Sequence, residues 1–167
     1  MRIGIIGTSE EAKTELAILL AKTLNLPPLI GIEEEEARLL GTGEISDIAL
    51  AVKHRIQVLS RLVREEERLK RFVTDLTALD CLARWKAGKL SNYDSNAGGA
   101  YKAACMARIN RYDLLVYDSN GSEDAALREL IEKCCRDVPV IIVHGSPESK
   151  VQQTLSFLRN IKGAAAL

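Results

Sequence analysis

The residues best suited to chemistry lie near the start of the chain, where Gly7 is followed five residues later by Ala12, Lys13 and Thr14. This spacing approximates G-x-x-x-x-G-K-[ST], a pattern in which backbone amides at a helix N-terminus hold phosphate oxygens, the lysine neutralises them and the hydroxyl residue binds Mg²⁺. We therefore expect ATP or another NTP, with Mg²⁺, to bind at one continuous segment: Gly7, Thr8, Ser9, Glu10, Glu11, Ala12, Lys13 and Thr14.

Two features of this segment depart from the pattern. Ala12 stands at the position of the second glycine. Glycine is favoured there because the backbone comes close to the phosphate or adopts a conformation that only glycine adopts easily, and the Cβ of alanine interferes with both. Glu10 and Glu11 add two carboxylates, which repel a triphosphate unless they point outward. The alternative interpretation is an ordinary turn between a strand and a helix, with Lys13 and Thr14 in the first helical turn.

A phosphate site of this kind needs an acidic group at a neighbouring strand end, to anchor Mg²⁺ or to act as a base toward an acceptor hydroxyl. Asp75 follows Phe-Val-Thr, and Asp118 ends the more apolar run Leu-Leu-Val-Tyr. Both are predicted metal anchors, and Asp75 is also assigned a catalytic role with Lys13. For either residue, a strand-end turn or helix cap is the alternative.

Apolar periodicity predicts the elements that position these residues. Strands are expected at residues 2–6, 29–32, 71–75, 112–118 and 139–143. Helices are expected at residues 15–25, 45–69, 77–85, 100–111 and 122–136, and from residue 147 onward. The alternation of apolar strands with amphipathic helices predicts an α/β fold of three layers, with a mostly parallel sheet and helices on both faces.

Composition indicates the number of domains, the classes of partner, the location of the protein and the role of its cysteines. The 167 residues suit a single domain, and 23 Lys plus Arg balance 23 Asp plus Glu, so no global field favours nucleic acid or an acidic membrane. No apolar run is long enough to span a bilayer, and we expect a cytoplasmic protein. The four cysteines lack the spacing of a metal site or a disulfide framework and are expected to be core thiols.

Most other charged and polar segments are expected to be exposed to solvent. The acidic run at residues 33–36 and most arginines of the helix at 45–69 are predicted to be solvated. Arg84, Arg108 and Arg111 are candidates for contact with an acceptor phosphate, with a solvated surface position as the alternative. Residues 88–99 are rich in Gly, Asn and Ser and are predicted to form a mobile loop.

With these residues in place, the chain resembles the P-loop nucleoside and nucleotide kinase superfamily, especially compact NadR-like ATPase/kinase domains with a degenerate Walker A motif. The resemblance lies in the Gly7 to Thr14 segment, in the stretch Thr-Asp-Leu-Thr-Ala-Leu-Asp at residues 74–80, and in the strand at 112–118. It implies a P-loop domain over residues 1–167 and assigns the acidic role to Asp75. The chain departs from the family in two places. Leu76 stands where the family commonly has Arg. Residues 118–127 contain no basic side chain, although a lid in this region would supply arginines to the transferred phosphoryl group.

Three hypotheses follow. The first is an ATP-dependent phosphotransferase acting on a nucleoside, nucleotide or similar small acceptor. The second, based on Ala12, Leu76 and the missing lid arginines, is a kinase-like module that has lost catalysis and binds or assembles, as a homodimer through the long helix at residues 45–69. The third is a flavodoxin-like or Rossmann-type domain, which strand order distinguishes from the other two.

Overall fold

The computed structural model describes residues 1–41, 47–119 and 124–164. Its elements, in order, are β1 (Arg2–Gly7), α1 (Glu10–Leu24), β2 (Pro28–Leu29), α2 (Ile32–Leu40), α3 (Ile48–Leu69), β3 (Phe72–Thr74), α4 (Ala78–Ala87), a 3₁₀ turn (Leu90–Asn92), α5 (Ser95–Ile109), β4 (Leu114–Asp118), α6 (Ala125–Cys134), β5 (Val140–Val143) and α7 (Pro147–Ala164). The predicted starts of two helices, at residues 45 and 122, lie outside the described residues.

Within the described residues, the strands form one sheet in the order β2-β3-β1-β4-β5, and every pairing is parallel. β1 lies between β3 and β4, so the third strand is beside the first. This is the order expected of a P-loop kinase, and it excludes the flavodoxin-like and Rossmann-type alternatives, whose strand orders differ. The parallel arrangement also brings the carboxyl ends of β1, β3 and β4 to one edge of the sheet.

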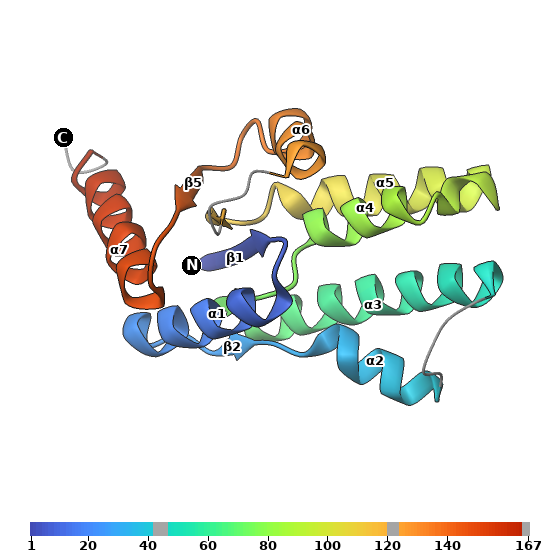
Figure 1. The fold of residues 1–167 in the computed structure, drawn as a ribbon, viewed down its shortest axis with the longest axis horizontal. Helices are drawn as coiled ribbons and strands as arrows, with labels where there is room; N and C mark the ends of the chain where they lie inside the picture. Colours follow the sequence, from blue (N-terminus) through green and yellow to red (C-terminus); the bar gives the residue numbers. More distant parts are fainter. Residues whose placement is uncertain (42–46, 120–123, 165–167) are drawn as a thin grey trace.

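Helices cover both faces of the sheet, as predicted, because alternate residues of each strand point in opposite directions. Ile3 and Ile5 pack with α1 and α7 on one face, whereas Ile6 packs with the residues of α3, α4, α5 and α6 on the other. Figure 1 shows α1 beside α7, and α4, α5 and α6 together on the opposite side of β1. The strand β1 is therefore held from both sides.

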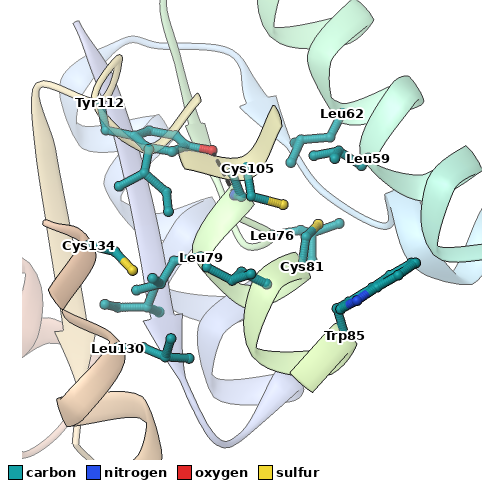
Figure 2. Packing of buried hydrophobic residues seen from close by; sticks show 14 of the residues in the cluster. Leu59, Leu62, Leu76, Leu79, Cys81, Trp85, Cys105, Tyr112, Leu130 and Cys134 are labelled. Carbon is teal, nitrogen blue, oxygen red and sulfur yellow. Dashed lines mark hydrogen bonds between the residues drawn. The ribbon is translucent and has the colours of Figure 1, made fainter. Parts of the chain in front are cut away.

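The larger core joins α3, α4, α5 and α6 (Figure 2). Trp85 is buried, stacks on Tyr101 with ring centroids 4.2 Å apart and donates a hydrogen bond from Nε1 to Ser91. All four cysteines are buried, and burial raises the pKa of Cys105 and of Cys135 to about 12. The prediction of core thiols is therefore confirmed.

The acidic run and the start of α5 are more helical than the sequence pattern predicted. Residues 95–99 begin α5 rather than extend the predicted loop, because Asp94 caps the helix by accepting from the amides of Asn96 and Ala97. The acidic run belongs to α2. Its residue Glu34 is exposed as predicted, whereas the other three carboxylates pair with arginines of α3 and α4: Glu33, Glu35 and Glu36. No helix among the described residues has the length and apolar character needed to cross a membrane.

Arg108 is also placed differently from either prediction made for it. Its guanidinium is buried beside Glu66 and Glu67, and the Glu66 carboxylate accepts a hydrogen bond of 2.5 Å from the hydroxyl of Tyr112. Arg111 pairs with Glu67 at the surface. These arginines therefore tie α5 to the end of α3.

Candidate functional site

The turn after β1 places Gly7 against the end of β4. Gly7 pairs with Asp118, and a Cβ at residue 7 would lie 2.8 Å from the Asp118 carbonyl oxygen. Because that atom belongs to the backbone of the neighbouring strand, a side chain at residue 7 would force the two strands apart. The first glycine of the motif is therefore required by strand packing.

Gly7→Ala is expected to reduce the free energy of unfolding by about 1–3 kcal/mol, the usual cost of forcing atoms into a packed region. Gly99→Ala is the matched control, since a Cβ there meets no atom within 4 Å, and helix propensity should stabilise α5 by roughly 0.5–1 kcal/mol. Urea denaturation measures both. An equal effect of the two substitutions would contradict the packing argument.

Helix α1 begins at Glu10, earlier than a phosphate-binding loop of this length would allow. Ser9 is the N-cap: its side chain accepts from the Ala12 amide at 3.3 Å, and its carbonyl accepts from the Lys13 amide at 3.0 Å. Two amides that the motif directs at phosphate are thus bonded to Ser9. Ala12 is a helical residue, so the conflict expected of its Cβ does not arise in this conformation.

Lys13 projects from the first turn of α1 toward α4. Its ammonium lies 3.1 Å from Asp80 Oδ1 and 3.1 Å from Glu10 Oε2, and its side chain is 1% exposed. Burial alone would lower the pKa of Lys13, but the carboxylates of Asp80 and Glu10 outweigh this and raise it above the ordinary value. Lys13 is therefore a charged ammonium whose two anionic partners belong to the protein.

Asp80 is fixed by the start of α4. Its Oδ2 accepts from both the amide and the hydroxyl of Thr77, at 2.8 and 2.6 Å, while the Thr77 hydroxyl accepts from the Asp80 amide. This reciprocal capping box makes Thr77 the N-cap of α4 and orients the carboxylate toward Lys13. The sequence analysis assigned Asp80 no role, although the T-x-x-D spacing was a signal for the cap.

Thr14 lies one residue further along α1 and faces the end of β3. Its hydroxyl donates a hydrogen bond of 2.6 Å to Asp75 Oδ2. Burial raises the pKa of Asp75, against the opposing effects of the Thr14 hydrogen bond and the Lys13 charge. The structure therefore brings together the two residues that the motif and the strand-end argument selected separately.

Asp118 occupies a different environment at the end of β4. Its Oδ2 lies 2.8 Å from the ammonium of Lys150 in α7, and both side chains are buried. The sequence analysis did not identify Lys150. Of the two predicted anchors, Asp75 is the one that contacts Thr14.

Arg84 supplies a second cation beside the turn. Its guanidinium binds Glu10 Oε1 at 2.5 Å and also contacts Glu33 of α2, which in turn pairs with Arg55. Lys13, Glu10, Arg84 and Glu33 therefore form a chain of alternating charges across α1, α4 and α2. Neither Glu10 nor Glu33 could be paired with Arg84 from sequence spacing, since the contacts join distant segments.

A cavity of about 580 Å³ opens where β1 ends, between α4 and α6. This volume lies within the range of small-molecule sites. Gly7 and Thr8 line it beside Glu10, Asp80 and Arg84. Its other lining residues come from α4 and from α6 with its N-cap: Ala83, Lys86, Ala87, Asp124, Ala126, Leu127, Glu129 and Leu130.

The fold of the chain is similar to that of solved kinase structures whose sequences are 16–19% identical to it. Deoxyadenosine kinase from M. mycoides with bound dCTP gives a TM-score of 0.66 at 16% identity, covering 96% of this chain and 100% of that chain. The same enzyme with bound dATP gives 0.57 at 16% identity, covering 95% and 100%. Shikimate kinase from Aquifex aeolicus vf5 gives 0.50 at 19% identity, covering 97% and 98%.

No family model matches the chain, and no curated protein matches it in sequence. The likeness is therefore one of fold. Together with the strand order, it identifies the fold as that of the P-loop nucleoside and nucleotide kinases, confirming the fold class expected from the sequence.

Proposed function

We propose that this protein binds a nucleoside triphosphate with Mg²⁺ at the β1–α1 turn and transfers a phosphoryl group to a small acceptor, such as a nucleoside or nucleotide. The observation that carries the proposal is the 2.6 Å hydrogen bond between Thr14 and Asp75. It joins the hydroxyl of the motif to a carboxylate on the neighbouring strand, and Lys13 is adjacent in sequence. Hydroxyl and carboxylate oxygens are the hard ligands that Mg²⁺ prefers.

The protein supplies only part of the coordination that Mg²⁺ needs, so the substrate would have to supply further ligands. Among the described residues, His, Cys, Asp and Glu form no group of three suited to holding a metal by themselves. A bound Mg²⁺ would supply positive charge to neutralise the charge that develops on the phosphate oxygens during transfer. Thr14 and Asp75 would hold it from the protein side, with phosphate and water completing the coordination.

The other residues of the site take distinct roles in this proposal. Lys13 supplies a positive charge to the phosphate, and the amides of Glu10 and Glu11 lie at the N-terminus of α1, where the helix dipole favours anions. The cavity between α4 and α6 takes the remainder of the ligand against the apolar side chains of Ala83 and Leu127. Arg84 adds a cation at its edge.

Calorimetric titration with ATP and Mg²⁺ tests binding, using wild type and Lys13→Met. The proposal predicts binding to wild type below millimolar concentration and at least about tenfold weaker binding to the variant. Phosphate transfer to a panel of nucleosides and nucleotides then tests turnover. Absence of wild-type binding at millimolar nucleotide contradicts the proposal.

A second candidate is a binding or assembly module without turnover, and specific observations favour it. Ser9 uses two amides of the motif, Lys13 is neutralised by Asp80 and Glu10, and Leu76 is buried where an arginine is common in similar kinases. This candidate predicts nucleotide binding without phosphate transfer, and a homodimer through α3. Transfer that is abolished by Lys13→Met would exclude it, and light scattering tests the dimer separately.

A further inference from the structure

The Glu10 carboxylate contacts both cations beside the cavity. One oxygen lies 3.1 Å from the Lys13 ammonium and the other lies 2.5 Å from the Arg84 guanidinium. Two anionic oxygens bridging an ammonium and a guanidinium are what a phosphoryl group would supply at this place. Glu10 also lies in the first turn of α1, where the helix dipole favours negative charge.

Glu10 and Asp80 bind the same ammonium in different ways. The Asp80 side chain is 6% exposed and is fixed by two hydrogen bonds from Thr77. The Glu10 side chain is 54% exposed and lines the cavity. An exposed ion pair contributes little net free energy, so Glu10 can turn into solvent at small cost, whereas Asp80 is a permanent partner.

Turning Glu10 away would leave both cations with one carboxylate each. Lys13 would keep Asp80, and Arg84 would keep Glu33. Each would then present an unfilled donor direction toward the cavity, with the first amides of α1 beside them. The site that results is a two-cation anion site at a helix N-terminus.

From this geometry, and resting on the proposed function, we infer that Glu10 occupies the position of a ligand phosphoryl group and determines which anions enter the cavity. A monoanion gains no more from Lys13 and Arg84 than Glu10 already does. A metal-bound polyphosphate gains additional contacts to Thr14, Asp75 and the helix amides, and therefore displaces Glu10. Glu10 is thus a specificity-determining residue that favours metal-bound polyphosphates over simple anions.

Glu10→Gln tests the inference, and Glu15→Gln is the matched control. Glu15 lies in the second turn of the same helix, outside the phosphate-binding segment, is exposed, and carries the same charge. Wild type and both variants are titrated calorimetrically with inorganic tripolyphosphate and, separately, with ATP, each with Mg²⁺. Thermal unfolding confirms that the variants are folded, as expected for two exposed positions.

We expect Glu10→Gln to bind tripolyphosphate and ATP about tenfold or more tightly than wild type, and Glu15→Gln to differ by less than about threefold, since nearby charges act more strongly than distant ones. Equal changes in the two variants, or weaker binding by Glu10→Gln, would overturn the inference. If wild type binds ATP and Glu10→Gln shows no gain, the inference fails and the proposed function stands. If only Glu10→Gln binds, Glu10 blocks the site without being displaced, so both the selectivity inferred for Glu10 and the proposed function fail for the native chain. Absence of binding in all three contradicts both.

Discussion

Asp75→Asn is expected to lower phosphoryl transfer by about 100-fold or more, the scale associated with loss of a group that orients a catalytic metal or its ligands. The amide cannot supply the negative charge that Asp75 places beside the Thr14 hydroxyl. The Mg²⁺ concentration for half-maximal activity should rise in the variant. A fall in activity through misfolding alone would leave the Mg²⁺ dependence of the remaining activity unchanged.

The fold should tolerate this substitution. Burial raises the pKa of Asp75, so the protein already disfavours the charged form, and a neutral amide of similar size should not reduce the free energy of unfolding. Asp118→Asn provides the comparison at the neighbouring strand end. Because Asp118 binds Lys150 in the core, its replacement should reduce stability strongly and turnover by less than about tenfold. The reverse ranking of the two variants in turnover would contradict the assignment of Asp75.

Asp80→Ala should have the largest effect on stability, about 3–5 kcal/mol, because it leaves the Lys13 ammonium buried with only the exposed Glu10 as a partner. It also removes the capping box at the start of α4, which contributes a further amount of about 1 kcal/mol. Urea denaturation measures the loss, and Glu10→Gln is the control, with a change within about 1 kcal/mol.

A double variant separates the buried charge from the cap. Lys13→Met combined with Asp80→Ala removes both members of the pair, so the cost should fall well below that of Asp80→Ala alone. Two results would contradict a buried ion pair between Lys13 and Asp80: a loss of less than about 1 kcal/mol in the free energy of unfolding of Asp80→Ala, or a double variant that is less stable than Asp80→Ala.

The fold was largely predictable because its main signals are local. Apolar strands alternating with amphipathic helices identified the parallel sheet, and the motif between β1 and α1 indicated a P-loop strand order. A helix was predicted from residue 77, and the structure places the N-cap of α4 at Thr77. These features depend on residues close together in sequence, for which periodicity and capping chemistry are informative.

The start of α1 was missed although its signals were present. Ser9 followed by Glu10 and Glu11 is a cap with two acidic residues in the first helical turn, and both features favour a helix from residue 10. The phosphate motif predicted an open loop over the same residues. The structure shows a helix from Glu10 capped by Ser9, as local capping favours.

The charge network could not be predicted, because its contacts join segments far apart in the chain. Glu10 meets Arg84 across 74 residues, and Lys13 meets Asp80 across 67. The sequence identified Glu10 as a carboxylate that would repel phosphate, but not the cations that hold it. Tertiary packing of α4 against the start of α1 decides that arrangement.

The structure of the protein crystallised with ATP and Mg²⁺ would test the account most directly. We predict phosphate density against the Lys13 ammonium, the metal beside Thr14 and Asp75, Asp80 still bound to Lys13, and the Glu10 side chain turned into solvent. Nucleotide bound elsewhere, or no nucleotide at saturating concentration with Glu10 still paired to Lys13 and Arg84, would contradict it.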